Sequence, residues 1–153
     1  MKSRWAALGL VLALGVFMPD RLDAQSAPPT APEQQGQVEF GPNYPNPFNL
    51  DTRIPFALGA PPQCQEQGRL YRVTMRIYNL LSQLVAVPVL EGGAGGGSGG
   101  QPLENVQLPC DRYTAYWDGK VQSTSQDAGR GIYLYSLEVD GKSYGVKRMF
   151  LRR

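Results

Sequence analysis

Apolar and polar residues alternate along several short segments of the chain. Between residues 70 and 79, tyrosine, valine, methionine and isoleucine occupy positions 71, 73, 75 and 77, whereas arginine or threonine occupies 72, 74 and 76. A period of two is typical of a β-strand, whose successive side chains point to opposite faces. Similar patterns predict strands over residues 52–58, 113–117, 131–139 and 144–151, and a continuous apolar run predicts another over 84–90.

Turn residues separate these segments. Asp118-Gly119 and Asp140-Gly141 are strong turn pairs, and the second predicts a hairpin between the last two strands. Pro55 and Pro88 lie inside predicted strands, which we therefore expect at sheet edges, because proline cannot donate to a ladder. No helical period follows the N-terminal region. The pattern predicts an all-β fold, a β-sandwich of about seven strands over residues 38–153.

Three aromatic residues follow the strand alternation. Trp117, Tyr133 and Tyr135 lie at positions that face the same way as neighbouring apolar residues. Interiors of β-sandwiches are built from such alternating positions. We therefore expect these rings in the core, with Trp117 between the sheets, rather than on a platform for a ligand.

The segment 43–49 precedes the first of these strands with an unusual composition: Asn43, Tyr44, Pro45, Asn46, Pro47, Phe48 and Asn49. Its two prolines fix φ and push each preceding residue toward an extended conformation, so the segment is neither a helix nor a central strand. We predict a rigid entry to the domain. Tyr44 and Phe48 would be its apolar anchors, and Asn46 and Asn49 would form local Asx-type turns.

The N-terminus predicts export. Lys2 and Arg4 precede an apolar stretch over 6–17, and 22–24 offers a small-residue cleavage site, so residues 1–24 are interpreted as a signal peptide. The apolar stretch is shorter than the roughly 20 residues of a transmembrane helix, so no membrane span is expected after cleavage. Residues 25–37 are rich in proline and glutamine and predict an extended or disordered tether.

Export bears on the two cysteines, Cys64 and Cys110. In an oxidising compartment we expect them to pair, although two unpaired thiols are the alternative. Two cysteines are too few ligands for a structural zinc site. The glycine-rich run 92–100 lacks the Lys-Ser/Thr and helix of a phosphate-binding loop, so it is interpreted as a flexible connection between strands.

The amino-acid composition restricts the kinds of catalytic and binding site that we expect in this chain. The chain has no histidine, which removes Ser-His-Asp and Cys-His arrangements and the usual general base near neutral pH. A formal net charge of +2 over 153 residues predicts no nucleic-acid-binding face. We expect no enzyme activity, no catalytic residue, no cofactor, no metal ion and no small-molecule substrate. Protein partners are the expectation that remains.

Several segments resemble, in order, blocks of a known family. These are 43–49, 76–81 (Arg-Ile-Tyr-Asn-Leu-Leu), Trp117-Asp118-Gly119, 131–135 (Gly131, Ile132, Tyr133, Leu134, Tyr135) and 147–153. Together they resemble the type A C-terminal sorting domain of the type IX secretion system, which is related to the immunoglobulin-like domain of the flagellar hook-capping protein. The resemblance covers residues 38–153.

The resemblance implies an immunoglobulin- or fibronectin-III-like sandwich without catalysis. It also implies passage across the inner membrane and recognition by secretion machinery at the outer membrane. The recognition residues would lie in the last strand and its basic end, namely Lys147, Arg148, Arg152 and Arg153. The expected location is the periplasm, the outer membrane and cell surface, or the medium.

A sorting domain is normally appended to cargo, and here only the tether separates the signal peptide from the sandwich. This suggests an alternative, a stand-alone structural subunit of a cell-envelope complex. Such a subunit would bind its partners through edge strands or through its N-terminal tether.

Overall fold

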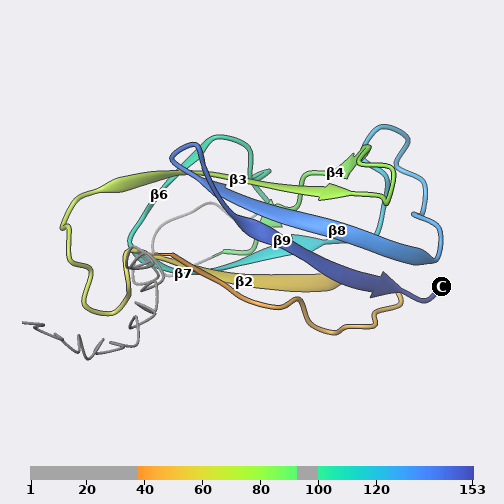
Figure 1. Cartoon of the computed structure of the whole chain (residues 1–153), viewed down its shortest axis with the longest axis horizontal. Helices are drawn as coiled ribbons and strands as arrows, with labels where there is room; N and C mark the ends of the chain where they lie inside the picture. Colours follow the sequence, from red (N-terminus) through yellow and green to blue (C-terminus); the bar gives the residue numbers. More distant parts are fainter. Residues whose placement is uncertain (1–37, 93–99) are drawn as a thin grey trace, which may run out of the picture. The chain divides into compact units, whose positions relative to one another are not determined.

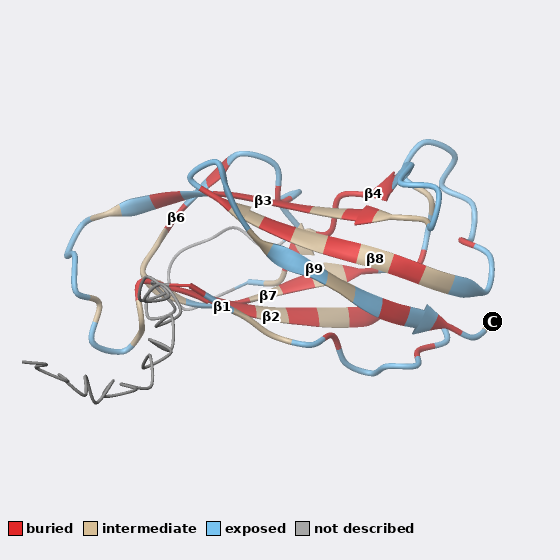
Figure 2. Ribbon diagram, viewed as in Figure 1, coloured by how far each residue is buried: buried red, intermediate tan, exposed pale blue. Residues whose placement is uncertain are grey.

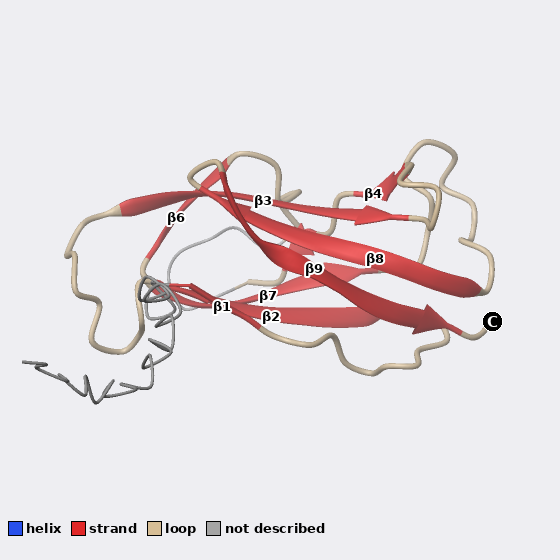
Figure 3. Cartoon of the chain, viewed as in Figure 1, coloured by secondary structure: helices blue, strands red, loops and turns tan. Residues whose placement is uncertain are grey.

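The computed structural model describes residues 38–92 and 100–153, which form nine β-strands and no helix (Figure 3). One sheet has four strands, in the order β1 (Val38–Phe40), β2 (Thr52–Leu58), β7 (Asp111–Trp117) and β5 (Val89–Leu90). The other has five, in the order β4 (Leu84–Ala86), β3 (Leu70–Tyr78), β8 (Gly131–Val139) and β9 (Lys142–Leu151), and β6 (Val106–Pro109) also pairs with β3.

The strand pairs within both sheets are antiparallel, and the sheets face each other (Figure 1). This confirms the predicted all-β sandwich. The number of strands is nine rather than about seven. The six ranges that the pattern predicted individually leave out the short strands β1 and β6 and fuse β4 with β5. The predicted signal peptide, the predicted tether and residues 93–99 of the glycine-rich run lie outside the described residues.

The core lies between the sheets and follows the predicted alternation. On β3 the side chains at 71, 73, 75 and 77 are buried, and on β8 those at 133, 135, 137 and 139 are buried. Figure 2 shows this alternation as bands along both strands. Trp117, Tyr133 and Tyr135 are all buried, which confirms their assignment to the core. No helix in the described part of the chain is long and apolar enough to cross a membrane.

The last two strands form the predicted hairpin. Asp140 and Gly141 have φ values of 53° and 80°, and Val139 pairs directly with Lys142. Positive φ at both central residues is the requirement of a type I′ turn, which Asp-Gly satisfies. Strand β9 begins at Lys142, two positions before the predicted start.

The two prolines inside strands behave differently from expectation. β2 is an interior strand, between β1 and β7, so the edge assignment from Pro55 is wrong. The carbonyl of Pro55 faces β1 and accepts the N–H of Gly41 at 2.9 Å. Between the Phe40–Phe56 and Tyr44–Arg53 pairs, residues 41–43 lie opposite residues 54–55, so the missing N–H falls in a bulge.

Pro88 marks a crossing between sheets. The predicted strand over 84–90 is two strands, β4 in the five-stranded sheet and β5 in the four-stranded sheet. Each lies at the end of its sheet's strand order, so the edge assignment is confirmed while the single strand is not. The carbonyl of Pro88 accepts the N–H of Leu103 at 2.9 Å, which anchors the crossing.

The predicted disulfide between Cys64 and Cys110 is present, with 5.7 Å between the Cα atoms. Cys110 lies between β6 and β7, at the point where the chain passes from the five-stranded to the four-stranded sheet. Cys64 lies in the connection from β2 to β3. The bond therefore fastens this connection to the corner between the two sheets.

Candidate interaction site

The segment 43–49 is tied to the sandwich through a buried asparagine. The backbone N–H of Asn43 donates to the hydroxyl of Tyr135 at 2.9 Å, and its side-chain amide donates to Thr52 Oγ1 at 3.0 Å. Both Asn43 and Thr52 are buried. Burial raises the pKa of Tyr135, and the hydrogen bond from Asn43 partly opposes that rise. The hydroxyl therefore stays protonated at neutral pH.

The same segment pairs with the last strand. The N–H of Phe48 donates to the carbonyl of Phe150 at 2.9 Å, and the carbonyl of Phe48 accepts the N–H of Arg152 at 2.9 Å, which makes a parallel bridge to Leu151. Asn46 Oδ1 accepts the N–H of Phe150 at 3.0 Å. This corrects the predicted Asx turn at Asn46, because its side chain bonds to a distant strand rather than to its own turn.

The two predicted apolar anchors, Tyr44 and Phe48, differ in their burial. Phe48 is 1% exposed, whereas Tyr44 is 52% exposed, so only the prediction for Phe48 is confirmed. The Phe48 ring packs edge-on against Trp117, with centroids 5.6 Å apart. Trp117 in turn packs against Tyr133 at 5.3 Å. The segment therefore inserts the Phe48 ring beside Trp117 in the core and leaves the Tyr44 ring on the surface.

The turn after Trp117 lies close to the backbone of Leu50, just before β2. The indole N–H of Trp117 donates to Lys120 O at 2.9 Å, and Asp118 Oδ1 accepts the Lys120 N–H at 3.1 Å. Gly119 has a φ of 68°, and a Cβ there would lie 2.4 Å from the carbonyl oxygen of Leu50. Only glycine fits this close approach, which accounts for the glycine that follows Trp117 and Asp118.

Gly131 lies at the same end of the sandwich. It begins β8 and pairs with Leu151 of β9. The hydroxyl of Tyr133, two positions further, donates to Gly129 O at 2.6 Å. Burial raises the pKa of Tyr133, and the nearby Arg153 lowers it in part. The separate blocks 43–49, 117–119, 131–135 and 147–153 thus meet in space.

Of the four predicted recognition residues, Arg153 and Lys147 contact other side chains of the sandwich, whereas Arg148 and Arg152 form no ion pair with a described residue. Arg153 Nε donates to the carbonyl of Asn49 at 3.0 Å, and its Nη1 lies 2.6 Å from Asp127 Oδ1. The Lys147 ammonium lies 5.4 Å from the centroid of the Phe40 ring. Arg148 and Arg152 are exposed and have no carboxylate partner among the described residues.

Sequence reasoning missed the roles of Thr52 and Asp127. The signal for Thr52 was present, since it continues the period-two pattern of Ile54, Phe56 and Leu58 toward the core. Asp127 lies in the long connection between β7 and β8, where no pattern in the sequence indicates a partner. Its pairing with Arg153 depends on the three-dimensional path of that connection.

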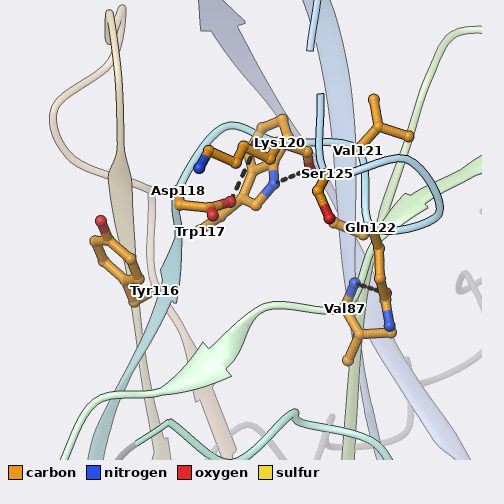
Figure 4. Close-up of a pocket in the computed structure, with 9 residues that line it drawn as sticks. Val87, Tyr116, Trp117, Asp118, Lys120, Val121, Gln122 and Ser125 are labelled. Carbon is orange, nitrogen blue, oxygen red and sulfur yellow. Dashed lines mark hydrogen bonds between the residues drawn. The ribbon is translucent and has the colours of Figure 1, made fainter. Parts of the chain in front are cut away.

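A pocket of about 360 Å³ lies beside the Trp117 turn, lined by Val87, Tyr116, Asp118, Lys120 and Gln122 among others (Figure 4). Figure 4 shows Tyr116 and Gln122 on opposite sides of it. Gln122 Oε1 accepts the N–H of Val87 at 2.9 Å, so this amide is already engaged in the fold. Within the described residues, no group of three or more Cys, Asp and Glu side chains could hold a metal ion.

Comparisons with known proteins show no family. No family model matches the chain, and no curated protein matches it. A solved structure that the chain resembles is the Pseudomonas fluorescens alkylpurine DNA glycosylase AlkC bound to DNA containing an abasic site analog. The likeness has a TM-score of 0.42 and 16% identity, and it covers 77% of this chain and 31% of that one.

That neighbour is an enzyme, and this contradicts our expectation that the chain has no enzyme activity. We therefore withdraw that expectation. Its physical basis was too narrow, because the absence of histidine excludes only histidine-dependent chemistry, and carboxylates, lysine or tyrosine can also transfer protons. A TM-score of 0.42 assigns no activity, substrate or DNA binding to the present chain.

Proposed function

We propose that the chain is an exported interaction module that secretion machinery of the type IX kind recognises at the cell envelope. The recognised surface comprises the segment 43–49 and the end of β9, residues 147–153. The proposal is supported by the resemblance of these blocks to the sorting family. The proposal also agrees with the disulfide between Cys64 and Cys110, because disulfides form and persist in the oxidising compartments that exported proteins reach.

The observation that carries the proposal is the pairing of Phe48 with β9. Two backbone hydrogen bonds of 2.9 Å join the opening segment to Phe150 and Arg152. Blocks that lie at opposite ends of the sandwich sequence therefore form one surface, on which Arg148 and Arg152 have no carboxylate partner within the described residues. A receptor could read the opening segment and the basic strand together through such a surface.

The pairing also bears on the alternative of a structural subunit. The β2 strand is interior, and Phe48 occupies the outer edge of β9 around Leu151. Strand addition is thus blocked at β2 and along this stretch of β9. The end strands β4 and β5 are the positions at which the structural-subunit alternative could still add a strand.

The experiment is a secretion assay with the full chain. A reporter enzyme is inserted between residues 37 and 38 and expressed in a host that has a type IX secretion system. We expect reporter activity on the cell surface or in the medium, and activity confined to the periplasm in an isogenic host without the system. Activity confined to the periplasm of the competent host would contradict the proposal.

Variants test the recognised surface. Arg148→Ala combined with Arg152→Ala should reduce surface reporter several-fold, because both charges are free to bind. Arg72→Ala combined with Lys120→Ala removes the same charge from exposed positions outside this surface and serves as the control. Equal secretion of the two double variants would remove these arginines from the proposal.

A further inference from the structure

The outward face of the five-stranded sheet carries a group of apolar side chains. Strand register places Ile132 beside Phe150, and Tyr78 between Leu84 and Leu134. Val146 lies on the same face, opposite Ser136. We call this set the outer apolar face: Tyr78, Leu84, Ile132, Leu134, Val146 and Phe150. Of these, Val146 is 60% exposed, Leu84 53% and Phe150 40%.

The other sheet has a different outward face. There the register places Arg53 beside Tyr116 and Arg112 beside Ala57. Arg53 forms ion pairs with Asp51 and Glu91, and Arg112 pairs with Glu39 at 3.6 Å. No large apolar side chain is exposed on the four strands of this sheet, β1, β2, β5 and β7, within the described ranges. The exposed large apolar side chains on the described strands thus belong to one sheet, and a cluster of such side chains is typical of an interaction surface.

Two arginines lie on the outer apolar face. Arg148 pairs across the strands with Leu134, so it lies within the face. Arg152 lies on the same side, because successive side chains alternate between the two faces of a strand. Neither has a carboxylate partner in the described part of the chain. Glu138 is the carboxylate that β8 contributes to this face, and it lies 4.0 Å from Arg76. The surface therefore carries more positive than negative charge.

The surplus of positive charge indicates which kind of partner would bind the outer apolar face. A second copy of the chain would bring the same surplus of arginine to the interface, and like charges at an interface cost binding energy. A partner with carboxylates around apolar side chains would satisfy both features. Arginine pairs well with carboxylates because its planar guanidinium can donate two hydrogen bonds to one carboxylate.

We propose that the outer apolar face binds an acidic segment of a partner protein. Apolar side chains of that segment cover Ile132, Leu134 and Phe150, and its carboxylates pair with Arg148 and Arg152. The inference rests on the proposed function, since it names the chemistry of the partner and the face of the sandwich that receives it.

The test is site-specific photo-crosslinking in the secretion-competent host, with the full chain that carries the reporter. A photoreactive amino acid replaces Leu84 or Phe150 on the outer apolar face, or Thr114 on the other sheet as the control. We expect one envelope protein to be captured from both positions 84 and 150 and not from 114. The crosslinked peptide should contain a surplus of aspartate and glutamate with apolar residues between them.

Charge variants make the result specific. Arg148→Glu should lower crosslinking from position 84 by about tenfold, whereas Arg148→Lys should retain most of it. Replacing an acidic residue of the captured peptide by arginine should restore crosslinking to the Arg148→Glu chain. A peptide without acidic surplus, or a yield insensitive to Arg148→Glu, overturns the inference.

Other occupants are outcomes of the same experiment. Crosslinks to a second copy, to lipid, or to residues 1–37 or 93–99 of the same chain each overturn the inference. Reporter location separates the two proposals in the same cells. A surface-exposed reporter without crosslinks from 84 and 150 refutes the inference alone, and a periplasmic reporter with the expected crosslink refutes the proposed function alone.

Discussion

The side chain of Asn46 accepts the backbone N–H of Phe150 at 3.0 Å, across 104 positions of sequence. An amide oxygen here takes the place that a neighbouring strand would have in a ladder. Two residues further on, the backbone of Phe48 continues the pairing with Phe150 and Arg152. The segment 43–49 therefore shields one stretch of the edge of β9, which would otherwise expose unpaired backbone groups.

Asn46→Ala should weaken this pairing. We expect the free energy of unfolding to fall by about 0.5 to 1.5 kcal/mol, because the Phe150 N–H loses its acceptor. Hydrogen exchange of the Phe150 amide should accelerate. Asn46→Asp keeps an oxygen at the same position and is the control. Unchanged protection of the Phe150 amide in Asn46→Ala would show that the side chain contributes nothing to the pairing.

Phe48→Ala should destabilise the sandwich strongly. Its ring is buried against Trp117, so removal leaves a cavity and costs about 3 to 5 kcal/mol. Chemical denaturation monitored by tryptophan fluorescence measures the loss. Tyr44→Ala, in the same segment but on the surface, should change stability by less than about 0.5 kcal/mol. Similar losses in both variants would contradict the different burial of the two rings.

Gly119→Ala should also be costly. The new methyl group would lie 2.4 Å from the carbonyl oxygen of Leu50, and the residue would keep a φ of 68°. We expect a loss above about 1 kcal/mol in the free energy of unfolding. Gly129→Ala is the matched control, because a Cβ at that position meets nothing within 4 Å. A neutral Gly119→Ala would mean that the Leu50 backbone moves away easily.

Tyr113 links stability to alkaline pH. Burial, helped by the carboxylate of Asp111, raises the pKa of Tyr113 to about 12. The unfolded chain loses this proton near pH 10, so the folded state binds it more tightly. The resulting stabilisation is complete below about pH 10 and is lost as the pH rises to about 12.

Tyr113→Phe should therefore show a shallower decline of unfolding free energy between about pH 10 and 12 than the wild type. Urea denaturation at a series of pH values measures both curves, with Tyr44→Phe as an exposed control. Parallel curves for Tyr113→Phe and the wild type would show that this hydroxyl is not the group responsible. The hydrogen bond from Tyr113 to Pro109 O at 2.9 Å is lost at every pH, so only the slope is diagnostic.

Reducing the disulfide should lower stability. Cys64 and Cys110 close a loop with a sequence separation of 46, for which the chain-entropy model gives about 4 kcal/mol. Denaturation of the Cys64→Ser/Cys110→Ser double variant measures the effect without reductant. Either single variant would leave a thiol able to form mixed disulfides, so the double variant is the proper comparison. A double variant as stable as the wild type would refute this contribution.

Much of the fold follows from local patterns. The alternation on β3 and β8, the Asp140-Gly141 turn and the buried Trp117 were predicted because each depends on residues close in sequence. The disulfide was predicted from the compartment and the number of cysteines, not from geometry. These features need no knowledge of which strands are neighbours.

The errors concern relations between distant segments. Pro55 lies in an interior strand because a bulge at Gly41 accommodates it, and no local pattern of 52–58 contains that information. The run 84–90 divides between two sheets, although its apolar pattern is continuous. Asn46 suits a local turn equally well, and only the position of β9 decides its partner. The candidate site was thus predictable as separate blocks, while their assembly was not.

The bond between Cys64 and Cys110 limits how the oxidised chain can travel. A chain pulled from either end through a narrow channel can no longer pass as a single extended thread, since the cross-link would bring two stretches into the channel at once. The corner where Cys110 joins the sheets would have to pass intact or be reduced first. An exporter that acts after oxidation must therefore reduce the bond or have an opening wide enough for more than one stretch of polypeptide, whereas one that acts before oxidation need admit only a single stretch.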